Sequence, residues 1–209
     1  MNILLLGGLP EEYEGIPISA DFRNMVQADL IMHEEKGCSQ TEMVLASLHQ
    51  LYPEIPKDIE KAINGLQWFF TRGEVLEDKE SGEPKKTPEK GFSFNQDANL
   101  IYSAFHATYG INLATIEFLH WWEFMALFEG LPETTLIQRV MYWRTADLKD
   151  LSKQERKHIL KMRKIYALKK PDKQRLSIEE LDKQTKDRVA RRYEEASAAL
   201  ARKEAEGGI

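Results

Sequence analysis

Residues 92–128 of the chain read FSFNQDANLIYSAFHATYGINLATIEFLHWWEFMALF, and this stretch dominates the composition of the sequence. It holds 10 of the 20 aromatic residues in 37 of the 209 positions. Such a density is typical of a hydrophobic core, a partner-binding surface or a ligand cage. Projected at about 100° per residue, Leu113–Glu129 is apolar in almost every direction. A helix of this kind is usually central and buried, so we expect a core helix, with a partner groove along one side as the main alternative.

Apolar residues recur at helical spacing through most of the remaining sequence. We expect the other helices at residues 21–36, 39–52, 56–72, 95–109, 132–143, 152–168 and 177–206. Capping boxes at Ser39, Ser152 and Ser177 mark three of the starts. Two short apolar runs, Ile3–Leu6 and Ile16–Ser19, predict a hairpin. The expected fold is mainly α: a compact multi-helix domain with a small N-terminal β-hairpin and a long C-terminal helix.

Charge and turn residues divide the chain into two expected parts. Residues 1–170 form a helical domain, which is interrupted by a charged loop at 74–91 containing Gly82, Pro84 and Pro88. Residues 171–209 form a charged C-terminal helical extension. The chain from Lys149 onward carries 18 basic and 11 acidic residues, whereas residues 1–148 carry 11 basic and 23 acidic ones. This asymmetry predicts an electrostatic partner for the basic end, or an intramolecular contact with the acidic part of the chain.

The sequence offers little for catalysis or for cofactor binding. It has no phosphate-binding glycine loop, no dinucleotide fingerprint, no zinc-protease motif and no nucleophile elbow. Glu117 and His120 have the spacing used in di-iron helical bundles, but such sites need a second Glu-x-x-His motif, which is missing. Glu117, His120 and Glu123 also interrupt the longest apolar run, so we expect no membrane span. We therefore expect a protein that is not an enzyme and holds no cofactor, metal or small-molecule substrate.

Seven short segments, taken together in order and spacing, are more specific than any of these motifs. They are Ala20-Asp21-Phe22-Arg23, Leu51-Tyr52-Pro53-Glu54-Ile55-Pro56, Phe94–Phe105, Tyr109–Leu113, Leu119-His120-Trp121-Trp122, Ala126–Pro132 and Tyr166-Ala167-Leu168. In these segments the chain resembles the bacteriophage gene-product-fifteen family, which is found in the tail modules of long-tailed phages and prophages. The resemblance covers roughly Met1 to Pro171 and does not extend to the charged end.

The resemblance implies a role in tail assembly. Genes of this family usually lie between those of the major tail protein and the tape-measure protein. The implied function is a tail assembly chaperone that shields the coiled-coil-forming tape-measure protein while tail-tube subunits polymerise around it. Its partners would be the tape-measure protein and the major tail protein, in the host cytoplasm, and it would be absent from the mature virion. The alternatives are a structural tail or connector component and a nucleic-acid-binding packaging or regulatory protein.

Four residues are the candidates for partner binding. Trp121 and Trp122 lie in the apolar stretch, where one indole face could line a groove. Tyr193 and Leu200 belong to the thin apolar stripe of the last expected helix, which is marginal in isolation and needs a partner. The sequence leaves open the oligomeric state, including a homo-oligomer, and the role of the basic extension.

Overall fold

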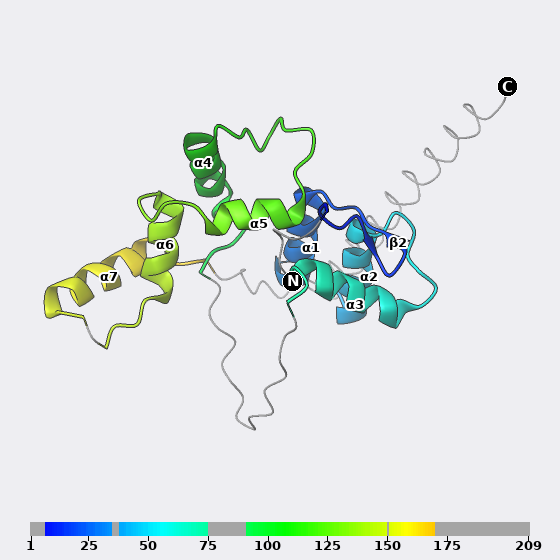
Figure 1. Cartoon of the computed structure of the whole chain (residues 1–209). Helices are drawn as coiled ribbons and strands as arrows, with labels where there is room; N and C mark the ends of the chain where they lie inside the picture. Colours follow the sequence, from blue (N-terminus) through cyan, green and yellow to red (C-terminus); the bar gives the residue numbers. More distant parts are fainter. Residues whose placement is uncertain (1–6, 35–37, 75–90, 150, 170–209) are drawn as a thin grey trace. The chain divides into compact units, whose positions relative to one another are not determined.

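The computed structural model describes residues 7–34, 38–74, 91–149 and 151–169. The first predicted strand, most of the charged loop at 74–91, the third capping box and the C-terminal extension with Tyr193 and Leu200 lie outside these ranges. In the described ranges the chain is mainly helical and has a two-stranded hairpin near its N-terminus, which confirms the predicted fold class (Figure 1).

The hairpin is smaller than predicted and uses a different first strand. β1 (Glu12–Tyr13) pairs antiparallel with β2 (Ile16–Pro17), so that Tyr13 lies opposite Ile16. The turn between them needs a left-handed backbone, and Glu14 and Gly15 have φ angles of 48° and 79°. The predicted strand Ile3–Leu6 lies outside the described residues, so its pairing with Ile16–Ser19 stays a prediction, whereas the tight turn at Glu14-Gly15 pairs Ile16 with Tyr13.

Seven helices follow along the described chain. Their bounds are α1 (Phe22–Glu34), α2 (Gln40–Leu51), α3 (Ile59–Phe70), α4 (Ala98–Tyr109), α5 (Trp121–Glu129), α6 (Leu136–Thr145) and α7 (Lys153–Ile165). The capping boxes predicted at Ser39 and Ser152 are both present, with the Glu42 and Glu155 carboxylates closing them. Helix α3 begins later than Pro56, because the Asp58 side chain caps it by accepting from the Lys61 amide at 3.0 Å.

The aromatic stretch supplies the core, as predicted, but its helix is shorter than expected. Of the helix predicted at Leu113–Glu129, only Trp121–Glu129 is helical, and residues 113–119 form an irregular segment before it. Four α5 side chains are buried: Trp121, Trp122, Phe124 and Phe128. Figure 1 shows α5 beside α1 and α4, both of which contact it. Helix α5 therefore buries one side in the core, whereas Glu123 and Ala126 are exposed and Met125 and Leu127 are half-buried, so it is not enclosed on all sides as its apolar pattern predicted.

A second, smaller cluster joins α6 to α7. Val140 and Trp143 of α6 pack on Ile159 of α7. Polar contacts fix the same junction, since the Arg163 guanidinium donates to the carbonyl oxygens of Trp143 at 2.8 Å and Ala146 at 2.7 Å. In the described residues no helix is apolar over the length needed to cross a membrane.

Candidate partner-binding groove

An open apolar groove of about 270 Å³ lies between the start of α1, the first half of α4 and the segment that follows α4. Ten residues line it: Phe22, Arg23, Val26, Phe94, Ala98, Ile101, Tyr102, Leu113, Ala114 and Phe124. Nine of these ten are uncharged, and Arg23 is the exception. We call this hollow the motif groove, because most of its lining comes from the segments that carry the family resemblance.

Stacked aromatic rings form the base of the motif groove. Phe124 of α5 stacks on Phe22 with ring centroids 4.7 Å apart, and on Phe105 of α4 at 5.0 Å. Phe94 approaches Phe124 at 6.2 Å. Offset stacking of this kind contributes about 0.5–1.5 kcal/mol per pair beyond the burial of apolar area. These ring contacts join α1, α4 and α5 beneath the groove.

The wall opposite α4 is held by a polar network around Asp21 and Arg23. The Asp21 carboxylate accepts from the Arg23 backbone amide at 2.9 Å and from the Leu119 amide at 3.3 Å. The Arg23 guanidinium pairs with Asp21 at 3.0 Å and donates to the carbonyl oxygens of Ile116 at 2.6 Å and Leu113 at 3.2 Å. Backbone bonds add to this network, since Phe22 donates to Leu119 and Trp121 donates to Ala20.

This network explains why residues 113–119 are not helical. Their carbonyl and amide groups bond to Asp21, Phe22 and Arg23, which lie about ninety residues earlier in the chain, instead of forming a helical ladder. Sequence periodicity depends only on local spacing, and for this reason the predicted helix began at Leu113. The same hydrogen bonds place Leu113 and Ala114 at the groove.

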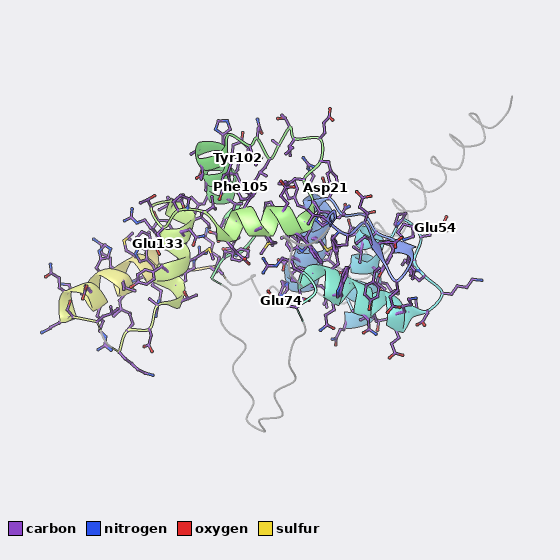
Figure 2. All side chains as sticks on the ribbon, in the orientation of Figure 1. Asp21, Glu54, Glu74, Tyr102, Phe105 and Glu133 are labelled. Atoms are coloured by element: carbon purple, nitrogen blue, oxygen red, sulfur yellow. The ribbon has the colours of Figure 1, made fainter. Side chains whose placement is uncertain are left out.

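Tyr102 forms the outer rim on α4. Its ring is 37% exposed, and its hydroxyl donates to the Asn112 side-chain oxygen at 3.3 Å. The same oxygen accepts from the Ala114 amide at 3.0 Å, so the rim and the opposite wall share one acceptor. Figure 2 shows Tyr102 and Phe105 on α4, with Asp21 at the start of α1. Ala98, Ile101 and Tyr102 have the i, i+3, i+4 spacing that puts them on one helix face.

The two predicted partner-binding tryptophans belong to the core. Trp121 is 1% exposed and Trp122 is 2% exposed. Each indole N–H donates to a backbone oxygen at the end of α3, Trp121 to Phe70 at 3.3 Å and Trp122 to Phe69 at 2.9 Å. In this conformation neither side chain is accessible to a partner, so their predicted binding role would require a rearrangement of the core.

Glu117 and His120 are not arranged as a helical metal-binding pair. His120 lies just before α5, where its Nδ1 accepts from the Trp122 amide at 3.0 Å and its Nε2 contacts the Pro10 carbonyl oxygen at 3.0 Å. These partners require a neutral ring with the proton on Nε2. Burial lowers the pKa of His120 and favours this neutral form. The described residues contain no group of three or more His, Cys, Asp or Glu positioned to hold a metal ion.

The basic helix α7 has an exposed face without acids. Its exposed basic side chains are Lys153, Arg156, Lys157, Lys161 and Lys164. Glu155 is engaged in the capping box, and hydrogen bonds from Ser152 lower its pKa. Arg163 is half-buried and fastens α7 to α6 through the carbonyl oxygens of Trp143 and Ala146.

The sequence did not predict the motif groove as a site. Phe22, Arg23, Ile101, Tyr102 and Leu113 were markers of a resemblance, with no role assigned to any of them. The signal that could have found the groove is their convergence, because these positions come from two distant parts of the sequence, residues 22–23 and 101–113, and meet at one surface.

A comparison with protein-family models gives one match, to the family described as Bacteriophage Gp15 protein, over residues 9–168. Comparison with curated proteins and with solved structures gives no match. The matched range ends in the C-terminal segment that follows α7 and includes every residue of the motif groove.

Proposed function

Because the chain belongs to the bacteriophage Gp15 protein family, we propose that it is a tail assembly chaperone without enzymatic activity that binds the tape-measure protein and assists tail-tube assembly in the host cytoplasm. Family membership supports the coarser statement that this is a structural or tail-related phage protein. The chaperone role, the tape-measure partner and the cytoplasmic location are parts of the proposal.

The observation that carries the proposal is the motif groove. It is apolar, open to solvent and backed by stacked aromatic rings. Proteins that bind amphipathic helices use grooves of this kind, into which a helix inserts apolar side chains at i, i+3, i+4 or i+7. A coiled-coil-forming tape-measure protein presents such side chains along its length before it is enclosed by the tail tube.

The lining of the groove suits apolar side chains, because nine of its ten residues are uncharged. Its volume of about 270 Å³ has room for one or two such side chains. Each large apolar side chain buried in it contributes about 1.5–3 kcal/mol before the cost of association is subtracted. One or two anchors therefore give weak, reversible binding, which suits a chaperone that must release its client.

Co-expression with the neighbouring tape-measure protein tests the proposal. Ala114→Arg puts a long charged side chain at the groove wall, at an exposed position whose backbone contacts are kept. Ala107→Arg is the matched control, because Ala107 is also exposed and lies on the face of α4 opposite Ala98. We expect the wild type and Ala107→Arg to keep the tape-measure protein soluble and in complex, and Ala114→Arg to lose both effects.

Two outcomes contradict the proposal. If wild-type protein neither changes the solubility of the tape-measure protein nor elutes with it, the chaperone role is wrong. If mass spectrometry finds the chain in purified virions at a stoichiometric level, the structural-component alternative is favoured, because a chaperone is expected to leave before the particle is complete.

A further inference from the structure

Helix α7 carries five basic side chains on one side, all of them exposed. They are Lys153, Arg156, Lys157, Lys161 and Lys164. At about 100° per residue they fall within about 140° of one another, with Arg156 at one edge and Lys161 at the other. The rise from Lys153 to Lys164 is about 17 Å along the helix axis. We call these five residues the α7 basic face.

No carboxylate neutralises the α7 basic face within the described part of the chain. Other cations in the same ranges do form ion pairs with acids: Arg23, Lys61, Arg72, Arg144 and Lys149. Glu155 is the one acid in residues 151–169; it closes the capping box at Ser152 and lies on the far side of the helix. Like charges at four-residue intervals destabilise a helix. The fold therefore gains nothing from this charge, and an anionic partner would relieve the repulsion.

Helix α7 is attached to α6 by a different side. Ile159 is buried against Val140 and Trp143. The Arg163 guanidinium donates to the carbonyl oxygens of Trp143 and Ala146. Figure 1 shows α7 beside α6, and the two helices are in contact. The α7 basic face is therefore not needed for this attachment and stays accessible.

The α7 basic face lacks the series of apolar side chains that a partner helix would need. Leu160 lies within the face and is 48% exposed, whereas Ile165 is 60% exposed and lies about 140° away from Leu160 around the helix. A helix in a groove or a coiled coil packs on apolar side chains repeated at i, i+3 or i+4 and i+7. The face offers one apolar contact and five charges, which favours a partner recognised by its charge.

Among polyanions, double-stranded nucleic acid fits this face best. A duplex carries about one negative charge per 1.7 Å of its axis, so several phosphates lie within the length that the five bases span. Each neutralised phosphate releases counterions, which is the main source of sequence-independent affinity. The face contains no aromatic side chain, so the bases of a single strand would have no stacking partner there. Lysine ammonium groups bind phosphates as point charges and do not read base edges.

We propose that the α7 basic face binds the phosphate backbone of double-stranded nucleic acid without sequence preference. The face neutralises about three to five phosphates, and the affinity at physiological salt falls in the non-specific range of about 10⁻⁴–10⁻⁶ M. The proposal does not depend on the motif groove or on the chaperone role, because none of the five bases lines that groove.

Fluorescence anisotropy of a labelled duplex, titrated with the full chain at about 50–200 mM salt, tests the binding. The logarithm of the association constant falls linearly with the logarithm of the salt concentration. The slope is about −3 to −4.5, since each neutralised phosphate contributes about −0.9. Duplexes of different sequence bind equally well. A wild type that does not bind at the lowest salt overturns the proposal, and so does a slope shallower than about −1.

Paired substitutions test whether α7 is the binding element. Lys157→Gln combined with Lys161→Gln makes the slope shallower by about 2 and weakens binding at the lowest salt at least tenfold. Lys183→Gln combined with Lys186→Gln is the matched control, because it removes the same charge from the C-terminal extension, and it leaves both values unchanged. Both variants unfold at the wild-type temperature. An α7 variant without effect overturns the proposal, and so does a control whose effect is as large.

Three further measurements separate the duplex from other occupants. Polyglutamate stands for an acidic protein and vesicles of anionic lipid stand for a membrane surface, and the duplex binds at least tenfold more tightly than either at the same salt. Equal or tighter binding of polyglutamate or of the vesicles assigns the face to that occupant and overturns the proposal. Leu160→Ala leaves duplex binding unchanged. A tenfold loss on Leu160→Ala also overturns the proposal, because phosphate contacts do not need that side chain.

Discussion

Replacing Arg144 by methionine is expected to destabilise the fold more than any other single change of a charged residue in the described chain. Arg144 lies at the C-terminal end of α6, and its side chain is only 10% exposed. Its guanidinium forms a two-pronged pair with Asp97, at 2.6 Å and 2.9 Å. It also donates to the carbonyl oxygens of Gly91 at 3.0 Å and Tyr166 at 2.7 Å. One side chain thus joins the approach to α4, the end of α6 and the segment after α7.

The expected loss follows from the burial of Asp97. The Asp97 side chain is 4% exposed, and besides Arg144 it accepts from the Ser93 amide at 2.9 Å. Arg144→Met leaves a buried carboxylate without its counter-charge, which typically costs about 3–5 kcal/mol. The freed carbonyl oxygens of Gly91 and Tyr166 lie nearer to solvent and add less. Asp97→Leu combined with Arg144→Met should be less destabilised than Arg144→Met alone, because no unpaired charge is then buried.

Urea unfolding followed by tryptophan fluorescence measures this loss, since Trp143 lies one residue from Arg144. Arg156→Met on the exposed face of α7 is the control and should change the free energy of unfolding by less than about 0.5 kcal/mol. A loss of less than about 1 kcal/mol for Arg144→Met would refute the reasoning, because the pair could not then be both buried and intact.

Three further predictions concern the core and the cap of α5. Trp121→Ala and Trp122→Ala should each lower the free energy of unfolding by about 3–5 kcal/mol; a variant that is nearly silent for folding yet abolishes partner binding would instead assign that tryptophan to a binding surface. Gly65→Ala should cost about 1–3 kcal/mol because its Cβ overlaps Tyr52, and a neutral thermal melt would contradict the packing of α3. Burial lowers the pKa of His120 in the folded chain. As the pH falls below the ordinary histidine pKa of about 6.5, the unfolded chain is therefore protonated first, and the free energy of unfolding decreases as the pH decreases further. His120→Asn keeps a capping side chain and should flatten this fall, and an unchanged pH profile would contradict the neutral cap.

The local elements of the fold could be predicted because their causes are local. Two capping boxes, the break after Leu51 and the buried character of α5 follow from residues within one or two turns of each other. The predicted helix at 95–109 begins instead at Ala98, because Asp97 turns its carboxylate back to the Ser93 amide and outward to Arg144. The helix at 132–143 likewise begins later, at Leu136.

The site could not be predicted because its causes are distant in sequence. The motif groove forms because Asp21 and Arg23 bind the backbone of residues 113–119 by hydrogen bonds, and because Phe22 stacks on Phe124. Neither contact leaves a periodic signal. Composition did point to the correct stretch, but it favoured the two tryptophans, which are the largest apolar side chains and lie fully buried in the core. The accessible residues are smaller and lie at the edge of the same core.

The most direct test of the central claim is the affinity between the purified chain and segments of the tape-measure protein, measured by isothermal titration calorimetry. The account predicts saturable binding of a coiled-coil segment by the wild type and by Ala107→Arg, with at least a tenfold loss of affinity in Ala114→Arg while all three proteins unfold at the same urea concentration. Equal binding by Ala114→Arg and the wild type would contradict the groove as the docking site, and no binding by the wild type to any segment would contradict the chaperone role itself.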